Sequence, residues 1–219
     1  MVTELFISII EMLFHQRKKM RYNSSVELSR FELTNGIADG YEKAIENRKK
    51  LMKQEYAAIV HEALKEAGIN FVAYLPDDQI HDAQKMITED PSFITVGATN
   101  EAEAVSACAG AWLGGAKPAL LIADSGFLVA TWPLASLSVS YGIPMLILIA
   151  HRGEVGDRAN WRFITYKFTT EPILQALQIP YVRASHPEET KEVIMGAKLS
   201  TFLWQHPVAV LFSGEILRD

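Results

Sequence analysis

The chain has 219 residues, of which 49% are hydrophobic and 21% are charged. This length and balance are typical of one globular domain, alone or with an appendage, and they exclude a disordered chain. The net charge of −5 disfavours a nucleic-acid-binding protein, because binding to phosphates usually requires a basic surface, and we expect no nucleic-acid partner.

Residues 1–21 combine an apolar helical face with a basic cluster. Leu5, Ile9 and Met12 fall at helical spacing, and the cations of residues 17–21 follow them. A signal peptide carries its cations before the apolar stretch, and a membrane span needs ~20 apolar residues, so we expect no transmembrane segment. Such a face fits a membrane surface or a partner subunit, and we favour the subunit. Residues 1–40 are therefore expected to be a helical extension and linker that supports self-association.

From residue 41 onward the pattern alternates between helices and strands. A charged helix over 41–67 ends at Gly68. Strands are predicted at 70–76, 93–98, 117–125, 143–151, 179–185 and 206–213, and helices at 78–90, 101–115, 127–141, 171–178 and 187–204, with a loop from 151 to about 170. Strands with near-continuous apolar runs between helices predict an α/β doubly wound fold over 41–219, with about six parallel strands and helices on both faces. Ligands in such folds bind at the carboxyl ends of the strands.

Several common site motifs are missing. The sequence contains no GxGxxG, no GxxxxGK[ST] and no HExxH pattern, and its six histidines show no ligand spacing, so we expect no metal site within this chain. Ser125 lacks the GxSxG elbow of a serine hydrolase. Cys108 is the only cysteine, which excludes an intrachain disulfide and fits a reducing cytoplasm. Because Cys108 lies among alanines, we interpret it as a buried packing residue.

Two glutamates stand at the start of the predicted helix 101–115. Asn100 is a favourable N-cap and Glu103 follows three residues later, which is the spacing of a capping box. Glu101 either complements the helix dipole or serves a ligand, since it follows a strand at the sheet end where ligands bind. Small residues such as Ala102 and Ala104 would allow a ligand to approach closely.

Four segments carry a family resemblance that extends over about residues 55–217. They are "NEAEAVSACAGAWLGG", "SGFLVATWPLASL", "YGIPMLILIAHRGE" and "HPVAVLF". Together they resemble the pyrimidine-binding domain of thiamine-diphosphate-dependent decarboxylases. The likeness is greatest to the alpha subunit of sulfopyruvate decarboxylase and to the matching half of phosphonopyruvate decarboxylase.

The resemblance implies a catalytic role for Glu101. Its carboxyl group would face a ring nitrogen of the aminopyrimidine of thiamine diphosphate and favour the imino tautomer, which removes the proton from the thiazolium carbon. The activated cofactor would then decarboxylate a small 2-oxo acid. The resemblance also implies that Ser125 and Gly126 border the cofactor and that His151 and Arg152 border the substrate. Positions at or next to the carboxyl ends of strands add Asp77 and Thr99 to the expected cofactor contacts, and Asp78 and Phe127 to the expected substrate contacts.

The chain departs from the family at the turn after the third predicted strand. The family has Ser-Gly-x-Gly-Asn there, whereas this chain has Ser125 to Val129 with Phe127 and no second glycine or asparagine. Bulk at this turn, together with the negative charge of Asp77 and Asp78, favours a substrate less anionic than a sulfonate or phosphonate. Arg152 fits either a substrate carboxylate or a salt bridge that fixes its loop.

The GDG motif that anchors the diphosphate and Mg²⁺ in this family is also missing. The resemblance therefore implies a separately encoded diphosphate-binding (beta) subunit, with the cofactor across a hetero-oligomeric interface. Three alternatives remain open: a non-catalytic or regulatory partner subunit, half of an acetolactate-synthase-like carboligase, and an unrelated small-molecule-binding α/β module.

Overall fold

The structure is a computed structural model that describes residues 52–154 and 163–217. All of these residues belong to one compact unit of the chain. The predicted extension and linker, residues 1–40, lie outside the described residues, as do residues 41–51 of the helix predicted over 41–67. The described part of that helix begins at Gln54, after the non-helical Met52 and Lys53. The boundary between the two predicted regions stays a prediction.

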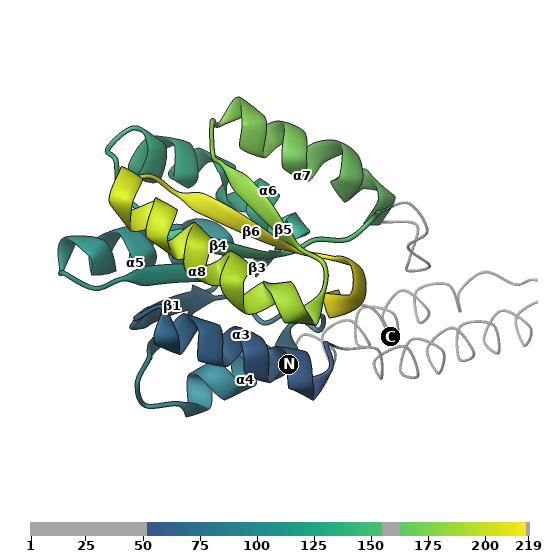
Figure 1. Cartoon of the computed structure of the whole chain (residues 1–219). Coiled ribbons are helices and arrows are strands. Elements are labelled where there is room, and N and C mark those ends of the chain that lie inside the picture. The colour runs from purple at the N-terminus through teal and green to yellow at the C-terminus, as the bar shows by residue number, and fades with distance from the viewer. Residues whose placement is uncertain (1–51, 155–162, 218–219) are drawn as a thin grey trace, which may run out of the picture. The chain divides into compact units, whose positions relative to one another are not determined.

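The described part of the chain forms a six-stranded sheet in the order β2-β1-β3-β4-β6-β5, with helices on both faces (Figure 1). Its strands are β1 (Phe71–Tyr74), β2 (Ile94–Gly97), β3 (Pro118–Ala123), β4 (Leu146–Ala150), β5 (Tyr181–Ala184) and β6 (Val208–Phe212). Its helices are α3 (Gln54–Glu66), α4 (His81–Glu89), α5 (Glu101–Leu113), α6 (Asp124–Pro133), the π-helix η1 (Leu134–Val139), α7 (Ile164–Ala176), α8 (Pro187–Trp204) and the 3-10 helix η3 (Gly214–Leu217). All strand pairs are parallel, so the predicted doubly wound fold is confirmed.

Burial follows the position of each strand in the sheet. The inner strands β4 and β6 are apolar and buried throughout, because helices cover both of their faces. The edge strands β2 and β5 expose Ile94 and Val182. Buried apolar side chains form one cluster between the sheet and helices α3, α4 and α8, and a second between the sheet and helices α5, α6 and α7. Cys108 lies in the second cluster, which confirms its interpretation as a packing residue, and burial raises the pKa of its thiol to about 12.

Two of the predicted boundaries that differ from the structure affect the candidate site. The third strand ends at Ala123 and α6 starts directly at Asp124, so the segment from Ser125 to Val129 is helical and not a turn. Helix α7 starts at Ile164, seven residues before the predicted helix, within the segment predicted to be a loop. The predicted helix stop at Gly68 is confirmed, since this residue follows the C-cap Ala67 of α3 and has a positive φ of 69°.

The strand order sets the location where a ligand would bind. Strands β1 and β3 are neighbours in the sheet. After β1 the chain continues to β2, on the side of β1 away from β3, and after β3 it continues to β4, on the side of β3 away from β1. A crevice opens at the carboxyl ends of two such strands, because the connections that follow them diverge. Within the described part of the chain, no helix is long and apolar enough to span a membrane.

Candidate active site at the carboxyl ends of the strands

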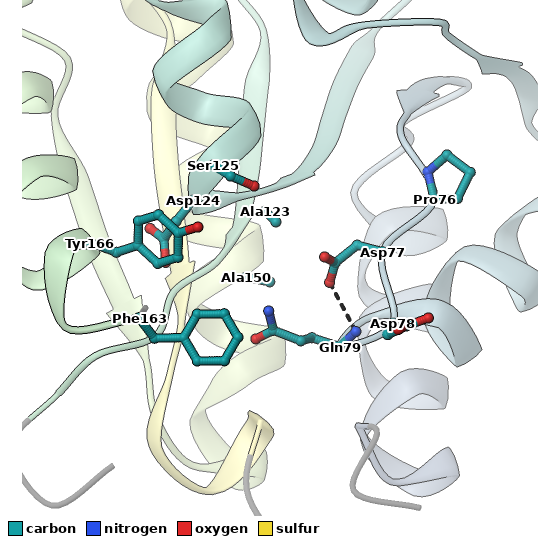
Figure 2. A pocket seen from close by; sticks show the side chains of 10 residues that line it. All are labelled: Pro76, Asp77, Asp78, Gln79, Ala123, Asp124, Ser125, Ala150, Phe163 and Tyr166. Atoms are coloured by element: carbon teal, nitrogen blue, oxygen red, sulfur yellow. Dashed lines mark hydrogen bonds between the residues drawn. The ribbon is translucent and has the colours of Figure 1, made fainter. Parts of the chain in front are cut away.

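A cavity of about 440 Å³ lies at this crevice. The residues after β1, the first residues of α6, the end of β4 and the start of α7 all contribute to it. In Figure 2, Phe163 and Tyr166 lie on one side of Ala123 and Ala150, and Asp77 and Asp78 lie on the other. The full lining consists of Pro76, Asp77, Asp78, Gln79, Ala123, Asp124, Ser125, Ala150, Phe163 and Tyr166.

The wall that follows β1 is acidic and tightly folded. The backbone N–H of Gln79 donates to Oδ1 of Asp77 over 2.9 Å, and Oε1 of Gln84 accepts from the Asp77 N–H over 3.1 Å. Burial raises the pKa of the Asp77 carboxyl, and the charges of Asp78 and Asp124 raise it further. Within residues 52–154 and 163–217, the buried Oε1 of Gln79 has no hydrogen-bond partner. This wall therefore offers acceptor oxygens to a ligand.

Asp124 joins three elements beneath the opposite wall. Its side chain is 1% exposed. Oδ1 accepts from Nδ1 of His151 at 2.9 Å and from Oγ1 of Thr170 at 2.7 Å, while Oδ2 accepts from the Arg152 N–H at 2.8 Å. A buried carboxylate needs such donors, because desolvation otherwise disfavours its charge. The network ties the start of α6 to the end of β4 and to α7, whose first residues line the cavity.

Glu101 lies at the start of α5, against the first turn of α6. A Cβ atom on Gly126 would come within 2.6 Å of Cγ and 2.7 Å of Cδ of Glu101, and still closer to Oε1. Neither Glu101 nor Gly126 belongs to the lining of the cavity, but Gly126 directly follows Ser125, which does. Among the described residues, none forms a hydrogen bond or ion pair with the Glu101 carboxylate. This partly buried acid is thus held by packing while its oxygens stay available.

Glu103 has a different environment. The Glu103 N–H donates to Oδ1 of Asn100 over 3.0 Å, which confirms Asn100 as the N-cap. Oε2 of Glu103 accepts from both N–H and Oγ1 of Thr99, one residue before the backbone position that a capping box would use. These bonds lower the pKa of the Glu103 carboxyl. The helix start therefore accounts for Glu103, and it also occupies Thr99, which does not line the cavity.

The remaining predicted site residues are Phe127, His151 and Arg152. Phe127 is fully buried in the apolar cluster between the sheet and α5, α6 and α7. His151 is 1% exposed, and its Nε2 lies 3.7 Å from Oε1 of Glu171. The Arg152 guanidinium lies over the ring of Phe163, 5.2 Å from its centroid. None of these three residues lines the cavity, and substrate contacts at them stay predictions.

Seven of the ten lining residues are not among the predicted site residues, and four of these seven carry polar or aromatic side chains: Gln79, Asp124, Phe163 and Tyr166. One signal was available for Asp124, which is the first charged residue after the apolar run of β3. Phe163 and Tyr166 give no such signal, because they lie in a predicted loop and reach the cavity only through the packing of α7.

Curated relatives connect this fold to a family, although no family model matches the sequence. The chain is 33% identical over 153 residues to a protein of Methanocaldococcus jannaschii named sulfopyruvate decarboxylase subunit alpha, an alignment that covers 70% of this chain and 90% of the relative. The protein of the same name from Methanococcus maripaludis is 30% identical, with 69% and 90% covered. A phosphonopyruvate decarboxylase of Streptomyces viridochromogenes is 32% identical over 42% of this chain and 23% of its own length.

A solved structure agrees on the fold. It is a 2-oxoglutarate:ferredoxin oxidoreductase from Magnetococcus marinus, with a TM-score of 0.60 and 15% identity, covering 76% of this chain and 30% of the other. At that identity the likeness concerns the fold alone. The sequence likeness to the relatives named as alpha subunits is much higher and spans nearly their whole length. The chain belongs to the family of sulfopyruvate decarboxylase alpha subunits.

Proposed function

We propose that this chain is the alpha subunit of a two-subunit, thiamine-diphosphate-dependent 2-oxo acid decarboxylase, and that Glu101 activates the cofactor. The observation that carries the proposal is that the Glu101 carboxylate has no hydrogen-bond partner among the described residues. Glu103 is bound by Thr99, whereas no described side chain binds Glu101, which rests on Gly126 at the ligand-binding end of the sheet. A carboxyl group in that state can share a proton with a ring nitrogen of a ligand.

The described residues fit one part of the cofactor. Glu101 would meet the aminopyrimidine, and the glycine at position 126 leaves the space in which its carboxyl lies. When bound, thiamine diphosphate would supply the electron sink for the carbanion left by the departing carbon dioxide. No group of three or more His, Cys, Asp or Glu side chains in residues 52–154 and 163–217 is arranged to hold a metal ion. We assign the diphosphate and Mg²⁺ to a partner beta subunit, because the sequence lacks the GDG motif and the relatives are named alpha subunits.

We also propose that the substrate is less anionic than sulfopyruvate. Three aspartates line the cavity, and none of its described lining residues is a lysine, arginine or histidine. A sulfonate stays charged at every physiological pH, so carboxylates close to it would repel it. A 2-oxo acid with an uncharged side chain avoids this repulsion, and it should show a higher kcat/KM than sulfopyruvate. A higher kcat/KM for sulfopyruvate would refute this assignment.

The test of the cofactor role is a matched pair of variants. The full chain is purified with its partner subunit, and carbon dioxide release from 2-oxo acids is measured with and without thiamine diphosphate and Mg²⁺. Glu101→Gln should lower kcat by about 100-fold or more, because it removes the acidic proton. Glu103→Gln, in the same helical turn, should retain most of the activity.

Two results would contradict the proposal. Full activity in Glu101→Gln would exclude the role assigned to that carboxyl. Equal affinity for thiamine diphosphate in the complex and in the partner subunit alone, measured by titration calorimetry, would favour a non-catalytic alpha subunit.

A further inference from the structure

Gly126 lies in a place where the backbone does not require glycine. It belongs to the first turn of α6 (Asp124–Pro133), and it is not among the glycines with a positive φ. In a helix, alanine is more favourable than glycine, because glycine loses more backbone entropy on folding. Glycine is therefore needed at this position because there is no room for a Cβ atom.

The space above Gly126 is filled by Glu101. A Cβ atom there would lie 2.6 Å from Cγ and 2.7 Å from Cδ of that side chain, whereas non-bonded carbon atoms normally stay about 3.5–4.0 Å apart. The contact involves the middle of the Glu101 side chain as well as its end, so a small adjustment of the carboxylate alone would not relieve it. The Glu101 side chain thus packs directly against the backbone of α6 at Gly126.

We propose that Gly126 is a positioning residue: the absence of its side chain fixes the Glu101 carboxyl at the location from which it serves the cofactor. This inference rests on the proposed function and deepens it. An alanine at 126 would force Glu101 to rotate away from α6 by about 1 Å or more to restore normal contact distances. A misplacement of that size costs about 10- to 100-fold in rate when the displaced group takes part in the chemistry.

The chain offers two matched controls. Gly110 in α5 and Gly196 in α8 are also helical glycines, and a Cβ atom on either would meet nothing within 4 Å. Gly110→Ala and Gly196→Ala should keep wild-type activity and melt at the same or a slightly higher temperature, because alanine favours the helix. Gly126→Ala makes the same chemical change, so any difference from these two variants reports on the contact with Glu101.

The experiment combines kinetics with a structural measurement on the full chain in complex with its partner subunit. In Gly126→Ala, kcat should fall by about 10- to 100-fold with little change in the KM for the 2-oxo acid. Proton–deuterium exchange at the thiazolium carbon of bound thiamine diphosphate should slow by a similar factor. A crystal structure of the variant alpha subunit should show the Glu101 carboxyl displaced. The melting temperature should stay within a few degrees of wild type, because the obstructing atoms belong to a side chain that can rotate.

The outcomes separate this inference from the function on which it rests. If Gly126→Ala keeps full kcat, or loses kcat with Glu101 in its wild-type position, the positioning role is wrong. If Glu101→Gln is fully active, the proposed function fails, whatever Gly126→Ala does. Should Gly126→Ala not fold, the double variant with Glu101→Ala, which lacks Cγ, Cδ and Oε1, should fold. A double variant that also fails to fold would place the need for glycine elsewhere and overturn the inference.

Discussion

Asp77 contributes to the cavity a carboxyl group that folding makes harder to ionise. Burial is the main cause of its raised pKa, and the charges of Asp78 and Asp124 add to it. A carboxyl whose pKa is higher in the folded state binds more protons there than in the unfolded chain. Stability must then fall as the pH rises from the ordinary Asp pKa through the raised one. Asp77 therefore costs stability at neutral pH, as residues placed for function often do.

Replacing Asp77 by asparagine should remove this cost. The variant keeps Oδ1 as an acceptor for the Gln79 N–H and loses the charge. We expect Asp77→Asn to be more stable than wild type at pH 7, and the advantage to shrink as the pH is lowered towards 4. Urea unfolding of both proteins between pH 4 and pH 8 measures this difference. An advantage that stays constant over that range would mean that ionisation of Asp77 is not its source.

At the scale of elements, α7 depends on Asp124 for its place beside the cavity. Thr170 lies in the middle of α7, and its hydroxyl donates to the buried Asp124 carboxylate, to which β4 is also tied through His151. Phe163, directly before α7, and Tyr166, in its first turn, line the cavity. A change at Asp124 should therefore reach the cavity through the helix.

Asp124→Ala would leave three donors without their acceptor. We expect a loss of about 3 kcal/mol or more in the free energy of unfolding, since removal of one partner from a buried charged network leaves the others unpaired. Ser125→Ala, at the neighbouring exposed position, should change stability by less than about 0.5 kcal/mol. Urea unfolding compares the two variants. Equal stability of Asp124→Ala and wild type would show that the network does not hold α7.

The elements that sequence could predict are those with a strong local pattern. The buried strands β3, β4 and β6 are uninterrupted apolar runs, and Asn100 and Gly68 mark helix ends by their own chemistry. The start of α7 was missed because Thr165, Thr169 and Thr170 are poor helix formers, and Pro172 is typical of a first helical turn. Tertiary contacts, including that of Thr170 with Asp124, stabilise the helix through this segment.

As with the fold, the sequence could predict those residues of the site that have a local signal. Position after a strand indicated Asp77, Asp78 and Ser125, all of which line the cavity. Sequence could not reveal that Gly126 touches Glu101, because the two residues are joined only by the packing of α5 on α6. Nor could it reveal that Phe127 points into the core, since that depends on α6 starting at Asp124 with no turn before it.

For the molecule as a whole, exposed apolar side chains indicate where a partner would bind. Helix α6 exposes Val129 and Trp132 one turn apart, and Trp132 is 77% exposed. Phe168 of α7 is 72% exposed. These two helices pack together and carry one wall of the cavity. A cofactor shared between two subunits would bring the partner to this side of the sheet.

Trp132→Lys should therefore weaken the complex with the beta subunit, because large aromatic residues often dominate interface energetics. We expect the dissociation constant to rise by about 10-fold or more, since the substitution removes an aromatic anchor and buries a charge. Leu203→Lys provides the control: Leu203 is 71% exposed but lies on α8, which covers the opposite face of the sheet. Titration calorimetry with the purified beta subunit compares the two. A larger effect of Leu203→Lys would place the interface on the other face.

The abrupt passage from β3 into α6 gives three consecutive residues three separate tasks. Asp124 points inward and anchors β4 and α7, Ser125 faces the cavity, and Gly126 supports Glu101 from α6. Because the first turn of α6 directs these three residues towards different neighbours, Ser125 can change without disturbing the contacts of Asp124 and Gly126. Libraries randomised at Ser125 alone would vary the lining of the cavity in a scaffold that keeps its anchor and the proposed catalytic acid, whereas libraries over all three positions would consist mostly of damaged proteins.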